Sequence, residues 1–245
     1  MTNWDLRLGW IIPSWNTVNE YEVERLTPPD ASHHFMRIAH TEDTPAAFDR
    51  MGAEAPAAAD LLAHAKMDAI CYACTAGSFY RGLQYDRTLA KQLAERTGRP
   101  VVTMAHSLID GARALGMQRI AVAAPYEGWL MDLLVKFLEE AGLKVLNSAN
   151  LGHQANVLYP PAKAIELAQR AWHPDADGLI MSCGNFRTLE AIDEIEELLG
   201  KPVVTSIQAS FWALFHETGT PLERDGAGVL LRGGAVAAEA HPPAA

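Results

Sequence analysis

The chain contains the stretch DAICYAC at residues 68–74, followed by GRPVVT at 98–103, and repeats it as DGLIMSC at 177–183, followed by GKPVVT at 200–205. In both copies the aspartate precedes the cysteine by six residues, with a short apolar run between them. The cysteine precedes the proline by 26 residues in the first copy and by 19 in the second, so the first copy has about seven extra residues in its loop or helix. This pattern predicts two βαβ units of the same design, each with a cysteine just beyond a buried strand.

Outward from the repeat, short apolar runs alternate with longer amphipathic stretches, which is typical of an α/β protein. Most of the runs are apolar on both faces, as are parallel strands covered by helices on both sides. Strands are expected at residues 6–12, 33–38, 69–72, 101–103, 119–124, 144–148, 178–182 and 203–205. Helices are expected at residues 20–26, 47–66, 84–97, 106–115, 128–141, 162–172, 188–199 and 208–216. The apolar run at residues 229–231 is a candidate for one more strand.

The duplication also predicts how the chain is divided. Residues 1–115 together with 206–245 are expected to form a first α/β half, and residues 116–205 a second one. Several helices are expected to end at glycines in the left-handed conformation. These glycines are Gly98, Gly116, Gly142, Gly200 and Gly219. If a pseudo-twofold axis relates the halves, the carboxyl ends of their strands face one cleft, where ligands of parallel sheets bind.

Composition excludes several classes of protein. The chain has 245 residues, of which 49% are apolar, so it can bury a large core without disulfides. Its net charge of −10 argues against nucleic acid as a partner, because phosphate backbones require a basic surface. Its apolar stretches are shorter than the roughly 18 residues of a membrane span, and no basic and apolar leader is visible. The three cysteines form an odd set, so we expect free thiols and a cytoplasmic protein.

Cys74 and Cys183 are the strongest candidates for catalysis. Each follows a predicted strand, and the residues after them, from Thr75 and from Gly184, are small or polar and expose backbone N–H groups. Such loops suit a bound carboxylate and also a thiolate. Two thiols across one cleft supply the acid and the base that are needed on opposite faces of a carbon atom when no cofactor takes part. The alternative is that both cysteines are small buried hydrophobic residues.

Other motifs give weaker evidence for a functional site. Cys71 and Cys74 have the C-x-x-C spacing of redox and zinc sites, but Cys71 falls within a predicted buried strand and no second close pair exists. The histidines lack metal-binding spacing, and no glycine-rich phosphate loop follows a strand. We therefore expect neither a metal nor a cofactor.

Two further segments follow predicted strands and reach the same edge. Ser14 and Asn16 come directly after the first strand, and Tyr126 comes after the strand at residues 119–124. Their polar groups can contact a ligand in the cleft. Alternatively, Ser14 and Asn16 are plain helix caps, and Tyr126 packs at the start of a helix.

Five segments together resemble a known group of proteins: PSWNT at 13–17, YAC at 72–74, APY at 124–126, SC at 182–183 and KPVVT at 201–205. They resemble the aspartate/glutamate racemase superfamily, in its branch of maleate cis-trans isomerases and arylmalonate decarboxylases, from about Arg7 to about Gly219. The resemblance implies two Rossmann-like halves around a pseudo-twofold axis, catalysis by cysteine without a cofactor, and a homo-oligomer.

Within this branch the sequence has features of both members. SFYRG at 78–82 and SCGNFRTL at 182–189 look like arylmalonate decarboxylase, which has glycine where Cys74 stands. The pattern of maleate isomerase is matched at five positions. These are Asn16, Cys74, Tyr126, Asn156 and Cys183. The resemblance therefore favours an isomerase of a small dicarboxylate, with maleate to fumarate as the best single choice.

The resemblance also implies roles for these residues. Cys74 adds to the double bond of maleate, the enediolate rotates, and Cys183 acts as the opposing acid and base. The carboxylates are expected to bind at Ser14, Asn16, Thr75, Tyr126, Asn156 and Gly184. Trp15 and His40 are bulky residues near this site, and the decarboxylase-like loops suit an aryl or alkyl group.

Three alternatives stay open at this point. The first is decarboxylation of substituted malonates, or racemisation of 2-aryl acids, with an arylalkyl carboxylate as the substrate. The second is an amino-acid or hydantoin-type racemase. The third is a carboxylate-binding module without catalysis, in which both thiols are inert.

Overall fold

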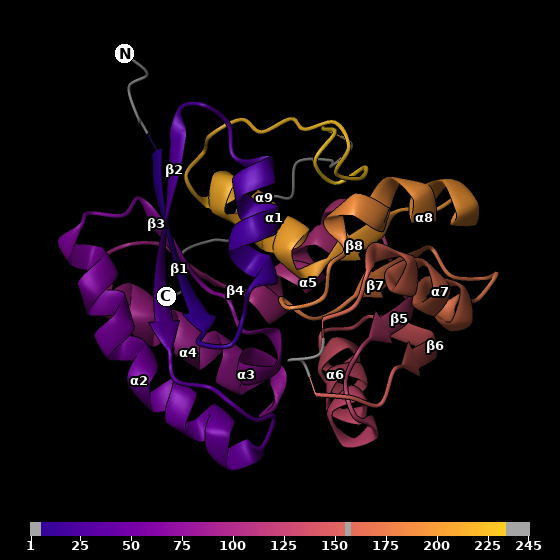
Figure 1. Cartoon of the computed structure of the whole chain (residues 1–245), viewed down its shortest axis with the longest axis horizontal. Coiled ribbons are helices and arrows are strands. Elements are labelled where there is room, and N and C mark those ends of the chain that lie inside the picture. The colour runs from indigo at the N-terminus through magenta and orange to yellow at the C-terminus, as the bar shows by residue number, and fades with distance from the viewer. Residues whose placement is uncertain (1–5, 155–157, 234–245) are drawn as a thin grey trace.

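The strands of the chain form two parallel sheets of the same design (Figure 1). The computed structural model describes residues 6–154 and 158–233. The strands are β1 (Leu6–Pro13), β2 (Ala31–Ile38), β3 (Ala69–Tyr72), β4 (Val101–Thr103), β5 (Arg119–Ala124), β6 (Lys144–Asn150), β7 (Gly178–Met181) and β8 (Val203–Thr205). The first sheet has the order β2-β1-β3-β4 and the second the order β6-β5-β7-β8. The two orders coincide when each strand number is raised by four, so the predicted α/β fold with two related halves is confirmed.

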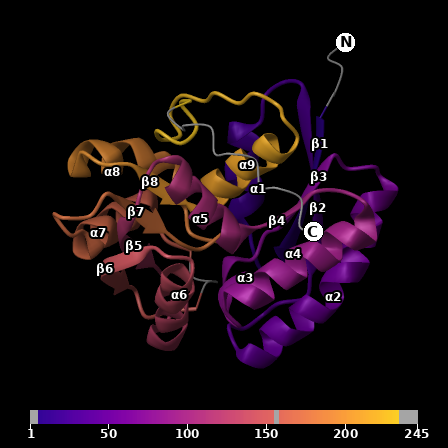
Figure 2. The same ribbon diagram turned by 180° about the vertical axis from the view of Figure 1, so that it is seen from behind.

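Helices cover both faces of the sheets (Figures 1 and 2). They are α1 (Val18–Leu26), α2 (Pro45–His64), α3 (Thr75–Phe79), α4 (Leu83–Thr97), α5 (Met104–Ala114), α6 (Gly128–Glu140), α7 (Pro161–Ala171), α8 (Ile192–Leu199) and α9 (Ser206–Glu217), with a 3₁₀ turn η1 at Leu189–Ala191. Helices α2 and α4 pack together on one face of the first sheet, while α1 and α9 cover the other. Among the residues described, no helix combines the length and the apolar character needed to cross a bilayer.

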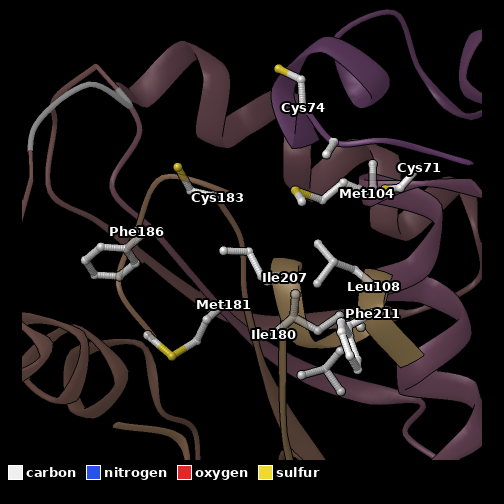
Figure 3. Packing of buried hydrophobic residues seen from close by; sticks show 14 of the residues in the cluster. Cys71, Cys74, Met104, Leu108, Ile180, Met181, Cys183, Phe186, Ile207 and Phe211 are labelled. Atoms are coloured by element: carbon white, nitrogen blue, oxygen red, sulfur yellow. The ribbon is translucent and has the colours of Figure 1, made fainter. Parts of the chain in front are cut away.

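Two helices join the halves. Helix α5 follows the last strand of the first sheet and contacts β7 and β8 of the second, and α9 follows β8 and contacts β3 and β4 of the first. The two helices also pack closely on each other. The core is therefore continuous between the sheets, and it includes Cys71, Met104 and Phe211 (Figure 3). Cys71 is fully buried, as predicted from its place in a strand. The domain boundaries at residues 115 and 205 stay a prediction.

The hydrogen bonds of the two halves explain why the sequence repeats. Asp68 accepts the backbone N–H of Arg7 at 2.8 Å, and Asp177 accepts that of Arg119 at the same distance, so each aspartate ties its strand to the start of the central neighbour. The second segment of each repeat, GRPVVT or GKPVVT, begins with a glycine. These residues, Gly98 and Gly200, end α4 and α8 in the left-handed conformation, at φ 63° and 62°. These φ values make glycine the suitable residue at both helix ends.

The threonines of the repeat end a strand and begin a helix. The Thr103 hydroxyl accepts the His106 N–H at 3.2 Å, and Thr205 forms a capping box with Gln208 at the start of α9. A threonine hydroxyl at this position pairs an N–H group that the helix leaves without a partner. The repeated threonine therefore places the start of each joining helix directly at the edge of its sheet.

The seven extra residues of the first copy lie in a helix. Helix α4 has 15 residues and α8 has 8, while the segment from each cysteine to its helix has the same length, at 75–82 and 184–191. The loops next to the two cysteines thus have equal lengths. The sequence left open whether the extra residues belong to the loop or to the helix, and the structure assigns them to the helix.

Three features differ from the expectations. Residues 229–231 form turns, not a strand, because the carboxylate of Glu196 accepts the Val229 N–H at 3.0 Å and Gly226 and Gly228 have positive φ. The short helix α3 was not expected, since its sequence TAGSF is too short to show a helical period. The expected helix at residues 188–199 begins with the 3₁₀ turn η1.

Candidate active site between the two sheets

A small cavity lies at the carboxyl ends of the strands, between the two halves. It has about 290 Å³ of space between its lining atoms, part of it open to solvent. The residues that line it follow β1, β2, β3, β5 and β7. They are Pro13, Trp15, Asn16, His40, Asp43, Ala73, Cys74, Thr75, Ala76, Tyr126, Cys183, Gly184 and Asn185.

Cys74 is the N-cap residue of α3, directly before its first residue, Thr75. The Gly77 N–H donates to its Sγ at 3.3 Å, so the thiol serves as the helix cap. A Cβ at Gly77 would lie 3.1 Å from Sγ and 3.0 Å from the Tyr72 hydroxyl, so only glycine fits without displacing its neighbours. Burial raises the pKa of Cys74, although the N–H groups of Gly77 and Ala76 act in the opposite direction.

Cys183 faces the same cavity from the second half (Figure 3). Its φ of 133° is rare for a residue with a side chain, and such strain is concentrated at functional sites. The Asn185 N–H donates to the Cys183 Sγ at 3.4 Å, and the Cys183 N–H donates to the Ser206 hydroxyl at 2.9 Å. Burial raises the pKa of Cys183 to about 12, against hydrogen bonds from Asn185 and Tyr126 that lower it.

These pKa shifts predict how the thiols react with pH. Because burial raises both pKa values, the thiolate is a minor form at pH 7, and its population grows about tenfold for each pH unit. We expect the rate of inactivation by iodoacetamide to rise about tenfold per unit from pH 7 to pH 9. Glutathione, titrated in parallel, is expected to level off near its ordinary thiol pKa of about 8.5. A plateau of the enzyme's rate near pH 7 would contradict the expectation.

Hydroxyl groups lie beside the two thiols, and one of them links the two cysteine loops. The Ser206 hydroxyl accepts the Thr75 hydroxyl at 3.1 Å as well as the Cys183 N–H, so one side chain holds both cysteine loops. The Tyr126 hydroxyl lies 3.2 Å from that of Ser182 and lines the cavity. Thr75 and Tyr126, both predicted from the sequence, are therefore brought to the two thiols.

Asn16 lies in the cavity wall and also fastens the second half. Its Nδ2 donates to the Gly184 carbonyl at 2.8 Å, and its Oδ1 accepts the N–H groups of Val18 and Asn19. It therefore caps α1, which is the alternative that the sequence left open, and it lines the cavity as well. A Cβ at Gly184 would lie 2.8 Å from Met104 Sδ, so a larger residue here would displace the Met104 side chain.

Among the described residues, one predicted site residue is not brought to the cavity. Ser14 is exposed and is not among the lining residues; its hydroxyl donates to the His40 carbonyl at 3.1 Å and accepts the His40 N–H at 3.0 Å. It joins the loops after β1 and β2. Asn156 lies outside the described residues. Within residues 6–154 and 158–233, no three His, Cys, Asp or Glu side chains are grouped to hold a metal ion.

Glu22, which the sequence analysis missed, clamps the loop that follows Cys183. This residue of α1 is only 1% exposed, and its Oε1 accepts the N–H groups of Thr188 at 2.7 Å and Leu189 at 3.0 Å. The spacing of four residues to the apolar Val18 and Leu26 could have placed Glu22 on the buried face of the helix. Burial raises the pKa of Glu22 from 4.5 to about 7.

This shift predicts how stability depends on pH. A raised carboxyl pKa favours folding below pH 4.5, and this contribution is lost as the pH rises through about 7. We therefore expect wild type to lose about 3 kcal/mol of free energy of unfolding relative to Glu22→Gln between pH 4.5 and pH 8. Urea titrations at each pH measure this difference. Glu20→Gln, on the exposed side of α1, is the matched control, and a difference that does not change with pH would contradict the prediction.

His40 and Asp43 complete the wall of the cavity. Both follow β2, both are buried, at 3% and 6% exposed, and His40 Nε2 lies 3.3 Å from Asp43 Oδ1. The sequence analysis named His40 only for its bulk and missed Asp43. The rule that ligands bind beyond the carboxyl ends of strands could have found both, had it been applied to the strand at residues 33–38.

The fold and the cavity define a class of α/β proteins in which two parallel-sheet halves enclose a pair of buried thiols. A family model described as arylmalonate decarboxylase matches residues 9–231, and the chain belongs to this family. The predicted branch is confirmed, and the chain is an enzyme, so a non-catalytic binding module is no longer supported.

Three relatives illustrate the likeness. The chain is 39% identical to arylmalonate decarboxylase of Bordetella bronchiseptica over 143 residues, which are 56% of this chain and 60% of the relative. The structure of maleate isomerase from Pseudomonas putida S16 with maleate has a TM-score of 0.89 and 28% identity, and covers 94% of this chain and 98% of its own. A mutant of Nocardia farcinica maleate cis-trans isomerase, with a covalently bound succinylcysteine intermediate, has a TM-score of 0.88 and 25% identity, with coverages of 93% and 98%.

Proposed function

We propose that the chain isomerises a small unsaturated dicarboxylate without a cofactor, with maleate to fumarate as the best single choice. The observation that carries the proposal is the pair of buried thiols, Cys74 and Cys183, in one small cavity between the halves. Two relatives with closely similar folds are named maleate isomerases. A cytoplasmic location, expected from the odd set of cysteines, and a homo-oligomer, expected from the family, also belong to this proposal.

In the first step the Cys74 thiolate attacks one alkene carbon. A C–S bond forms, the π electrons move onto the adjacent carboxylate as an enediolate, and the former double bond becomes a single bond that can rotate. The N–H groups of Gly77 and Ala76 favour the thiolate, which forms by loss of its proton to solvent. This step needs donors for the growing negative charge, because the net charge of the protein is negative.

Cys183 is proposed as the acid and base on the other side of the substrate. Its thiol protonates the enediolate carbon and gives a succinyl adduct, and its thiolate removes that proton again. After rotation the C–S bond breaks, the trans alkene forms, and Cys74 leaves as the thiolate. Asn16, Thr75, Tyr126 and the backbone near Gly184 are proposed to hold the carboxylates, together with Asn156 as the sequence suggested. Ser14 is proposed to act indirectly, by joining the loops after β1 and β2.

An NMR time course tests this proposal, because the alkene protons of maleate and fumarate have separate signals. Wild type with maleate should convert the first signal into the second without an added cofactor. If no fumarate forms while the protein remains folded, maleate is not the substrate.

Decarboxylation of a substituted malonate is a second candidate, favoured by the 39% identity to arylmalonate decarboxylase. In that reaction Cys183 protonates the enediolate that forms when CO₂ leaves, and Cys74 takes no necessary part. Release of CO₂ from phenylmalonate, unaffected by Cys74→Gly, would support this candidate over the isomerase.

A further inference from the structure

One aromatic side chain lies between the cavity and solvent. Every described residue that lines the cavity is buried, except Trp15, which is partly exposed. Its indole is also the largest side chain of the lining residues. Because the cavity is partly open to solvent while the rest of its described wall is covered, the exposed part of Trp15 marks the opening.

The turn that carries Trp15 is fixed to the first sheet. The Asn16 N–H donates to the Pro13 carbonyl at 3.0 Å, which closes the turn. From β2, Nη1 of Arg37 donates to the carbonyls of Ser14 and Asn16 at 3.0 and 2.8 Å. The carbonyls on both sides of Trp15 are therefore held by the same guanidinium group.

The same turn is also tied to the second half. The Thr17 N–H donates to Asn185 Oδ1 at 3.0 Å, and Asn16 Nδ2 donates to the Gly184 carbonyl at 2.8 Å. The backbone on the C-terminal side of Trp15 is thus bonded to the loop that follows Cys183. The turn cannot move away from the cavity without breaking hydrogen bonds to both halves.

The indole is oriented by a buried stack of rings. It meets the His40 ring edge-on, with centroids 4.9 Å apart and planes at 87°. His40 in turn stacks on Phe48 at 5.2 Å, and these two residues are 3% and 0% exposed. Edge-to-face contacts of this kind stabilise one ring orientation. The cover is therefore fixed at its backbone and at its ring.

A fixed cover restricts what can be attached to the reacting carbons. With the thiols and the other described walls buried and closely packed, a substituent on a substrate held at Cys74 and Cys183 is directed to the opening, where it meets the indole. A steric clash of this kind is a common way to reject a related ligand. One extra methylene group can already change kcat/KM by roughly 10-fold to 200-fold.

We propose that Trp15 covers the cavity and is the specificity-determining residue that restricts the substrate to dicarboxylates with only hydrogen on the alkene carbons. The inference rests on the proposed function for the reaction, and it narrows the substrate class. A methyl group on maleate, as in citraconate, is then disfavoured, and an aryl group is disfavoured more strongly.

Thiol labelling tests the cover without turnover. The thiolate adds to the alkene of a maleimide, a C–S bond forms, and the adjacent carbon takes a proton from solvent. Rates of labelling at Cys74 and Cys183 are measured at pH 7.5 with maleimide and with N-phenylmaleimide, by peptide mapping, and each is divided by the rate for glutathione. Wild type should disfavour the phenyl reagent by at least about 10-fold, and Trp15→Ala should lose most of this discrimination.

Two further variants control the labelling experiment. Trp15→Phe keeps a smaller ring and should give an intermediate discrimination. Trp212→Ala is the matched control, because Trp212 is also partly exposed but stacks on His216 in α9, at 5.1 Å, and is not among the described lining residues. It should discriminate as wild type does.

Turnover tests the consequence for the substrate. In Trp15→Ala, kcat/KM for citraconate relative to maleate should rise at least about 10-fold over the wild-type ratio. A ratio that stays at the wild-type value would contradict the assignment of specificity to Trp15.

The inference is overturned if wild type reacts with both maleimides at the same relative rate, or if Trp15→Ala and Trp15→Phe keep the wild-type discrimination. The wild-type comparison and Trp15→Phe decide even if Trp15→Ala does not fold. Failure of the proposed function looks different, because maleate would then stay unchanged in the NMR time course while the discrimination between the two maleimides holds.

Discussion

Replacing Cys74 with alanine should lower kcat/KM for the isomerisation by at least about 10⁴-fold, because the reaction loses its nucleophile and the other thiol that lines the cavity, Cys183, is needed as the acid and base. Initial rates of fumarate formation measure the loss. The KM effect should be small by comparison, since the carboxylate-binding groups are retained.

Cys71→Ala is the matched control for this substitution. Cys71 is also buried, but it lies within β3 and packs in the hydrophobic core (Figure 3). It should retain most of the activity, with only a modest loss of stability. If Cys74→Ala remained active while Cys183→Ala was inactive, the isomerase mechanism would be wrong and the decarboxylase candidate would gain support.

Cys183→Ser should stop the reaction after the first bond has formed. Serine is a far weaker acid and base than cysteine near neutral pH, so the enediolate formed by addition at Cys74 takes its proton from solvent, and removal of that proton from the succinyl adduct becomes slow. We expect turnover to fall by at least about 10³-fold, and the protein to accumulate the mass of one maleic acid.

Intact-mass spectrometry and peptide mapping would locate this adduct on Cys74. The double variant Cys74→Ala, Cys183→Ser should gain no mass, which separates covalent trapping from tight binding. An adduct on Cys71, or none on any cysteine, would contradict the assigned roles. The relative that carries a succinylcysteine supports the chemistry for the family.

The duplication in the sequence was enough to predict both sheets, because each repeated residue has one local task. Asp68 and Asp177 tie strands together, and Thr103 and Thr205 start the joining helices. Tasks of this kind depend on near neighbours in the chain or on one adjacent strand. They therefore leave a pattern that a single sequence can reveal.

The parts of the site that were missed depend on contacts between distant segments. The spacing of Glu22 to Val18 and Leu26 indicates a buried face, but its partner Thr188 comes from 166 residues away and leaves no local pattern. Asp43 lies beyond an expected strand, but nothing nearby in the sequence says that its loop turns inward. Ser14, in contrast, was predicted to be in the site but lies at the surface. Its hydroxyl is hydrogen-bonded to the backbone of His40, which is 26 residues away in the chain.

The position of the seven extra residues has a consequence for engineering. Seven residues are about two full turns at 3.6 residues per turn, so a helix lengthened by this amount keeps the same side against its sheet. The helices at the position of α4 and α8 can therefore be lengthened or shortened by whole turns, while the loops that follow the two cysteines keep their length. Helix α8 is accordingly the natural place to graft a binding peptide or a reporter.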